Sequence, residues 1–136
     1  MTVLDTSGAI DFLLGADTAA DVERLVTREA PLAAPDLLVF EVLAVFRRHV
    51  QRGALGAERA AGAIDDLGEM AIELFPTLRL RSAAWELREN LTASDGMFAA
   101  LAARLGEPLA TKDAGLAEAA RRHAGVEVIE LGARHG

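Results

Sequence analysis

Four acidic residues stand at places in the sequence where a charged side chain calls for an explanation: Asp5, Glu41, Asp95 and Asp113. Clustered carboxylates are the hard oxygen ligands that Mg²⁺ and Mn²⁺ prefer, and the chain has no cysteine to favour zinc. If the four gather within about 5 Å, each pair repels by roughly 3 kcal/mol at an effective dielectric near 20. Divalent cations would relieve this repulsion. The pattern therefore indicates metal-assisted hydrolysis of a phosphate ester, which needs no serine or histidine nucleophile.

Glu41 is the most informative of the four acids, because it is the only polar residue in the ten-residue stretch 37–46. On a helix, its neighbours three and four positions away are all apolar. Burying an ionised carboxylate without a partner costs several kcal/mol. We therefore expect a helix with no solvated face. Glu41 is either paired with an arginine or placed at the edge of the helix, or it has another cationic partner, such as a metal ion.

Taken one at a time, the three aspartates have simpler explanations. Asp5 and Asp113 each precede a predicted helix and could cap it, since aspartate is a favoured N-cap. Asp95 lies where a helix dipole alone would stabilise it. Position does not decide between capping and metal binding, so the metal interpretation depends on the acids lying together.

The elements that must position these residues alternate along the chain. Apolar runs predict strands at residues 2–5, 32–34, 71–75, 108–111 and 126–131. Helical spacing predicts helices at 9–14, 18–29, 37–51, 56–70, 78–91, 96–105 and 114–124, with Ser94 and Asp95 as the N-cap of the sixth. This alternation predicts an α/β fold in which a mostly parallel sheet of about five strands lies between helices on both faces. The strand ends then place Asp5 and Asp113 at one edge.

Composition limits the class of protein. The 136 residues suit a single domain (1–136), and 51% apolar residues exclude a disordered chain. No apolar run is long enough to span a membrane, and no signal peptide is visible, so we expect a cytoplasmic protein. A net charge of −7 argues against nonspecific coating of nucleic acid, although it does not exclude nucleic acid as a substrate.

Basic and aromatic residues bear on substrate binding. Arg47, Arg48 and Arg52, with His49, end the predicted helix 37–51 and either contact the backbone of a nucleic-acid substrate or form a solvated helix end. Aromatic residues make up only 4% of the chain, so a base-stacking platform is not expected. Trp85 is more consistent with the core than with a partner contact.

The acids and their surroundings resemble those of the PIN-domain nucleases and, among these, the VapC toxins of bacterial toxin–antitoxin pairs. The matching segments are Val3-Leu4-Asp5-Thr6-Ser7, Pro35 followed by Glu41, Ser94-Asp95 with the apolar residues 98–102, and residues 109–113, which together span almost the whole chain. The resemblance implies a three-layer PIN-like fold and a Mg²⁺-dependent endoribonuclease that accepts Mn²⁺ as a substitute. It further implies a cognate VapB-like antitoxin that folds over the active site, and a homodimer.

The resemblance also implies roles for individual residues. Asp5 and Asp95 would be the principal metal ligands, Glu41 and Asp113 would complete the acidic cluster, and Ser7 and Thr111 would orient carboxylates or waters. The chain departs from the family pattern at two places. It has Ala44-Val45 where an asparagine often follows the glutamate, and Ser94 where an aromatic residue often precedes the third acid. Both departures bear on substrate choice more than on metal chemistry.

Two other classes of function remain open at this stage. A receiver-like or phosphatase-like domain could use Asp5 as a phosphoryl acceptor, but Glu41 would then have no role, and no Asp-x-Asp motif follows the first strand. A non-catalytic binding module would use the acids only as helix caps and its apolar helices to hold a partner.

Overall fold

A computed structural model describes residues 1–26 and 30–132 of the chain. Its sheet contains β1 (Thr2–Leu4), β2 (Leu32–Pro35), β3 (Ile72–Phe75), β4 (Leu109–Thr111) and β5 (Val128–Glu130). The strands run in the order β3-β2-β1-β4-β5, and every neighbouring pair is parallel. The predicted five-stranded parallel sheet is confirmed.

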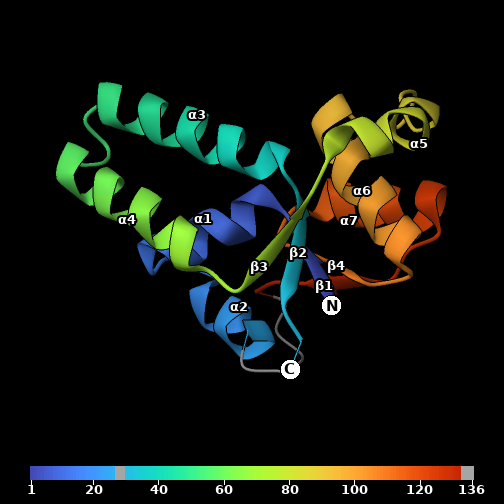
Figure 1. Cartoon of the computed structure of the whole chain (residues 1–136), viewed down its shortest axis with the longest axis horizontal. Coiled ribbons are helices and arrows are strands. Elements are labelled where there is room, and N and C mark those ends of the chain that lie inside the picture. The colour runs from blue at the N-terminus through green and yellow to red at the C-terminus, as the bar shows by residue number, and fades with distance from the viewer. Residues whose placement is uncertain (27–29, 133–136) are drawn as a thin grey trace.

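Helices cover both faces of this sheet. They are α1 (Thr6–Leu14), α2 (Ala19–Val26), α3 (Leu37–Gln51), α4 (Ala57–Glu69), α5 (Arg81–Glu86), α6 (Ala93–Leu105) and α7 (Ala114–Ala119), with a 3₁₀ turn η1 (Thr77–Leu80) and a π-helical turn η2 (Ala120–Ala124). In Figure 1, α1 to α4 lie on one side of the sheet and α5 to α7 on the other, and α3 and α4 extend away from it as a pair. This is the expected three-layer arrangement.

The strand order creates a site at one sheet edge. The chain leaves β1 for β2 and β3, and then returns to the other side of β1 to form β4 and β5. In open parallel sheets a ligand binds beyond the carboxyl ends of the strands at such a reversal. Asp5 follows β1 and Asp113 lies two residues beyond β4, so the topology brings both to this edge.

The core lies between the sheet and its helices. Val3 and Leu4 of β1 are fully buried, and so are their partners in β2 and β4. Helix α6 contributes a continuous buried segment, from Phe98 to Ala102. Burial of this helix against the sheet fixes the direction of its N-terminus, where Asp95 lies.

Several element boundaries differ from the predictions. Helix α1 begins at Thr6 instead of residue 9, because Asp5 caps it. The predicted helix 78–91 is divided into η1 and α5 and ends at Glu86, after which residues 87–90 form turns. The final strand, β5, is shorter than the predicted 126–131, and the last predicted helix, 114–124, finishes in the π-helical turn η2. The predicted end of the helix at 18–29 lies outside the described residues.

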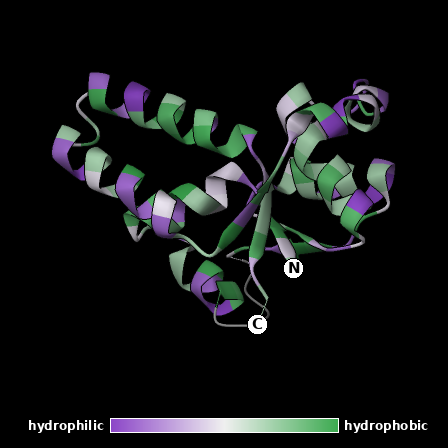
Figure 2. Ribbon diagram, viewed as in Figure 1, coloured by the Kyte–Doolittle hydropathy of each residue, from purple (hydrophilic) through white to green (hydrophobic). Residues whose placement is uncertain are grey.

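Two predictions about burial are wrong. Helix α3 has the predicted bounds but presents Val39, Phe40 and Leu43 to solvent, and Phe40 is 69% exposed. Trp85 is also on the surface, at 67% exposure, and Arg88 lies over its ring. Figure 2 shows α3 largely hydrophobic where it leaves the sheet and hydrophilic toward its far end.

Within residues 1–26 and 30–132, no helix is long and apolar enough to cross a membrane.

Candidate active site

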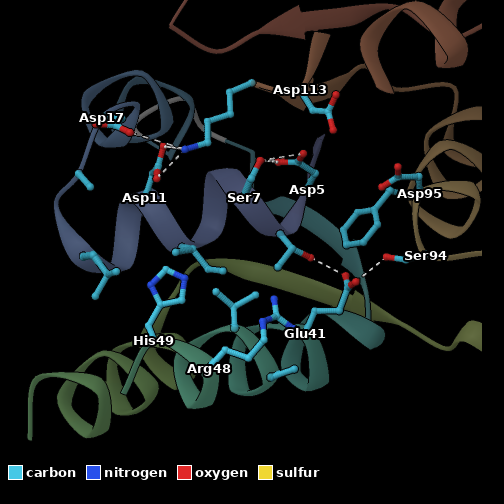
Figure 3. Close-up of a pocket in the computed structure, with 18 of the residues that line it drawn as sticks. Asp5, Ser7, Asp11, Asp17, Glu41, Arg48, His49, Ser94, Asp95 and Asp113 are labelled. Carbon is cyan, nitrogen blue, oxygen red and sulfur yellow. Dashed lines mark hydrogen bonds and ion pairs between the residues drawn. The ribbon is translucent and has the colours of Figure 1, made fainter. Parts of the chain in front are cut away.

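The four acids predicted from the sequence line one cleft of about 910 Å³ beyond the ends of β1 and β4. They come from four elements: Asp5 from the end of β1, Glu41 from α3, Asp95 from α6 and Asp113 from the start of α7. Figure 3 shows their side chains around this cleft, with Glu41 opposite the three aspartates. The structure therefore brings all four to the same place.

Asp5 is held in one orientation by three donors. Its Oδ1 accepts a hydrogen bond from the Gly8 amide (2.9 Å), its Oδ2 accepts one from the Thr111 hydroxyl (2.5 Å), and Ser7 Oγ lies 3.0 Å from both oxygens. Only 6% of Asp5 is exposed. This burial raises the pKa of Asp5 even though the three hydrogen bonds lower it, and the nearby charge of Asp113 raises it further. Asp5 is thus both a helix cap and a member of the acidic cluster.

Glu41 is held by two hydroxyl groups, and no described arginine pairs with it. Thr6 Oγ1 donates to Oε1 (2.6 Å) and Ser94 Oγ donates to Oε2 (2.5 Å). Nothing in the sequence pattern points to Thr6 as a partner of Glu41, although Thr6 directly follows Asp5. Ser94 was expected to cap the following helix and departs from the family pattern, but its hydrogen bond to Glu41 was not predicted. In this chain Ser94 supplies a hydrogen bond that ties α6 to α3.

Asp95 is a partly buried acid at the N-terminal end of α6. It lies in the first turn of α6, whose N-cap is Thr92, one turn earlier than the predicted cap at Ser94 and Asp95. Its backbone amide donates to Thr92 Oγ1 (3.1 Å), and a hydrogen bond with the Thr92 side chain acts to lower the pKa of its carboxyl group. Burial raises the pKa of Asp95, and the charges of Asp113, Asp5 and Glu41 raise it further. All three other acids therefore act electrostatically on this group.

Asp113 also combines two roles. Its Oδ1 accepts from the Leu116 amide (3.1 Å), which caps α7, and its own amide donates to Thr111 Oγ1 (3.0 Å). Thr111 is fully buried, and its hydroxyl links Asp113 to Asp5. Asp5 and Asp113 therefore both cap helices, as one of the two explanations predicted, and both also line the cleft.

The donor set suits a hard divalent cation. Every acidic ligand candidate offers carboxylate oxygens, and the pKa of the partly buried Asp95 is raised by burial and by the charges of the other three acids. The carboxylates are nevertheless not yet arranged around one point, because no three Asp, Glu or His side chains among the described residues form a preformed metal site. A bound ion would have to draw the carboxylates together, which the exposed position of Asp113 permits.

The basic residues near the site occupy different positions. Arg48 and His49 of α3 line the cleft, together with Lys112. Arg47 faces a separate apolar groove between α3 and α4, and Arg52 is the C-cap of α3, outside the residues that line the cleft. Of the three arginines predicted to contact RNA, Arg48 is therefore the one at the acidic cluster. Lys112 was not among the predicted contacts.

Comparisons with known proteins cover all of these residues. A family model described as the PIN domain matches residues 2–122. Ribonuclease VapC1 of Mycobacterium tuberculosis is 36% identical over 118 residues, which cover 86% of this chain and 89% of that protein. VapC ribonuclease Mb0985 of Mycobacterium bovis is 32% identical over 129 residues, which cover 95% and 98%. The fold is similar to the crystal structure of VapBC2 from Rickettsia felis bound to a promoter DNA fragment, with a TM-score of 0.71, 13% identity and coverage of 96% and 98%.

Proposed function

Because this chain belongs to the PIN-domain family, as its motifs predicted, we propose that it is a Mg²⁺-dependent endoribonuclease and the toxin of a VapBC-type pair. The observation that carries the proposal is the convergence of Asp5, Glu41, Asp95 and Asp113 on one cleft. Relatives named ribonucleases match this chain over most of its length. The proposed reaction is hydrolysis of an RNA phosphodiester bond.

Asp5 and Asp95 are the proposed principal ligands for Mg²⁺, or Mn²⁺ in its place, with Glu41 and Asp113 completing the set. A divalent ion bound there would lower the pKa of a water molecule and stabilise negative charge on the phosphate. Thr111 and Ser7 fix the Asp5 carboxylate, while Thr6 and Ser94 fix that of Glu41. Carboxylates held in this way lose little conformational freedom when they take up their ligand.

The cleft also has groups suited to the substrate. Arg48 can contact a phosphate of the RNA backbone next to the acidic cluster. Neither aromatic stacking nor a side-chain nucleophile is required, because the reacting phosphate is positioned through its charge. Choice of RNA would then depend on shape and backbone contacts.

The other two functions considered from the sequence fit the structure less well. The strand order differs from the 2-1-3-4-5 order of receiver-like domains. A phosphoryl acceptor at Asp5 would also leave Glu41, which lines the same cleft, without a role. A simple binding module does not explain four mutually repelling acids in one cleft.

Two protein partners are part of the proposal. Exposed apolar side chains on α3, and at Leu74, Leu78 and Trp85, offer surfaces for a cognate VapB-like antitoxin and for a second copy of the chain. The similarity in fold to a toxin–antitoxin complex supports the first partner. We place the protein in the cytoplasm, where its RNA substrate would be. Co-purification with the protein encoded by a neighbouring gene tests the antitoxin. Light scattering tests the homodimer, and cell fractionation tests the location.

The nuclease proposal is tested with purified protein and RNA. We expect cleavage with Mg²⁺ or Mn²⁺, no cleavage in EDTA, and no cleavage by a folded Asp95→Asn variant. Asp66→Asn removes the same charge from an exposed position on α4 and should cleave normally. Mn²⁺ should also raise the melting temperature of the wild type more than that of Asp95→Asn, because a ligand that binds only the native state stabilises it. Cleavage in EDTA, or full activity of Asp95→Asn, would refute the proposal.

A further inference from the structure

Asp11 is a buried carboxylate that the proposed reaction does not use. It lies on α1, six residues after Asp5, and only 5% of it is exposed. Lys112 Nζ donates to both of its oxygens (3.0 and 2.9 Å), and Thr18 donates to Oδ2 through its amide (3.2 Å) and its hydroxyl (2.8 Å). Since a buried carboxylate is costly without such partners, this arrangement needs an explanation.

Lys112 connects Asp11 to the acidic cluster. It is the only lysine of the chain and lies between Thr111 and Asp113, in the short loop from β4 to α7. This loop is attached to α1 at two points: Thr111 bonds to Asp5 at the start of the helix, and Lys112 bonds to Asp11 further along it. Six residues of helix separate these points by about 9 Å. Figure 3 shows Asp11 on α1, with its interactions drawn as dashed lines.

Two attachment points restrain the loop more than one does. Thr111 is also fixed in the sheet by its pairing with Glu130 of β5, so any movement of the loop would be that of Lys112 and the exposed Asp113. The ion pair with Asp11 opposes this movement and thereby limits where Asp113 can lie relative to Asp5. We propose that Asp11 is a positioning residue that acts through Lys112 to hold Asp113 in the acidic cluster. This inference rests on the proposed nuclease function for its kinetic consequence, but not for its structural one.

The structural consequence is measured first, on the metal-free protein. In Asp11→Asn, hydrogen exchange at the Asp113 and Leu116 amides should speed up, because both bonds depend on the position of the loop. The Gly8 amide, bonded to Asp5, serves as an internal reference and should change little. Lys112→Gln breaks the same ion pair from its more exposed side and should have the same effect. Circular dichroism establishes that each variant is folded.

The kinetic consequence follows for RNA cleavage. Displacing a ligand candidate by about 1 Å can cost up to about 100-fold in rate, so we expect Asp11→Asn to lower kcat about 10- to 100-fold with little change in KM. The double variant should be no slower than the slower single variant, because both substitutions break one contact. Asp17→Asn is the matched control. It removes the longer ion pair of Lys112 (3.7 Å), which has no hydrogen bond, and should change exchange and kcat much less than Asp11→Asn does.

The outcomes separate the possible failures. No cleavage by the wild type would refute the nuclease function, while exchange at Asp113 and Leu116 would still test the positioning role. Unchanged exchange and kcat in folded Asp11→Asn would overturn the inference. It would also be overturned if Lys112→Gln raised KM alone, because Lys112 would then contact the RNA instead of holding the loop.

Discussion

Replacing Thr111 by valine tests how the site is held together. The Thr111 hydroxyl donates to Asp5 Oδ2 at 2.5 Å and accepts from the Asp113 amide at 3.0 Å, and the residue is fully buried. Valine has nearly the same shape but carries a methyl group in place of the hydroxyl. The substitution therefore removes both hydrogen bonds without opening a cavity, and its effect reports on polar interactions within the site.

The expected loss of stability follows from these two bonds. A hydrogen bond to a charged group contributes about 1.5–3 kcal/mol and a neutral one about 1 kcal/mol. Part of this is recovered, since Ser7 remains 3.0 Å from Asp5 Oδ2 and the exposed Asp113 can turn its amide to water. We expect Thr111→Val to lower the free energy of unfolding by about 2–3 kcal/mol at neutral pH. Thr111→Ser keeps the hydroxyl and should lose much less.

The loss should depend on pH in a defined direction. Burial already raises the pKa of Asp5, and the Thr111 hydrogen bond opposes this rise. Without the hydroxyl, the pKa of Asp5 rises further, so the native variant is penalised most when Asp5 is ionised. The difference from wild type should be largest at neutral pH and shrink as Asp5 becomes protonated. Urea unfolding between about pH 8 and pH 4 measures it. A loss below about 0.5 kcal/mol, or an equal loss in Thr111→Ser, would refute this reasoning.

Three further predictions concern other parts of the molecule. Because the pKa of Asp95 is raised in the folded protein, ionising Asp95 lowers the free energy of unfolding as the pH rises above the ordinary value of 3.8. Metal-free Asp95→Asn should therefore melt at a higher temperature than the wild type at pH 7. This difference in melting temperature should vanish in acid. Gly8→Ala should lower the free energy of unfolding, measured in urea, by about 1–3 kcal/mol. The reason is that the added Cβ would lie 2.7 Å from Leu4 Cδ1 and 2.9 Å from Leu131 Cδ1. A stability equal to that of the wild type would contradict this packing. Phe98 is 1% exposed, so Phe98→Ala should lower the free energy of unfolding by about 3–5 kcal/mol. Phe40→Ala should stay within about 0.5 kcal/mol of the wild type at concentrations where the chain is monomeric. Similar losses of stability in the two variants would contradict the burial of these residues.

The acids were predictable because local sequence determines where they lie. Asp5 and Asp113 end apolar runs that form neighbouring parallel strands, so the sheet alone brings them together. Asp95 is positioned by the apolar helix that follows it, which packs deep against the sheet. Glu41 was conspicuous as the single polar residue of an apolar helix segment. Each of these inferences needs only the periodicity of one element and the rule for parallel sheet edges.

The partners of the acids were not predictable in the same way. Ser94 and Glu41 are separated by 53 residues, and Lys112 and Asp11 by 101, so nothing in the local pattern connects them. The expected burial of α3 failed for a related reason. Apolar periodicity shows that a face avoids water but does not say whether the same chain covers it, and Phe40 lies on a face that this chain leaves open.

The two kinds of exception to a well-packed fold have a common interpretation. Asp95 remains partly buried among like charges that raise its pKa, and α3 presents large apolar side chains to water. Each arrangement lowers the stability of the isolated chain, and residues 1–26 and 30–132 supply no group that relieves it. A cation would relieve the carboxylates, and a protein surface would cover the apolar side chains. If that interpretation is correct, cation and protein partner should each raise the melting temperature, and Asp95→Asn should reduce the gain from the cation while leaving the gain from a partner bound at Phe40 intact.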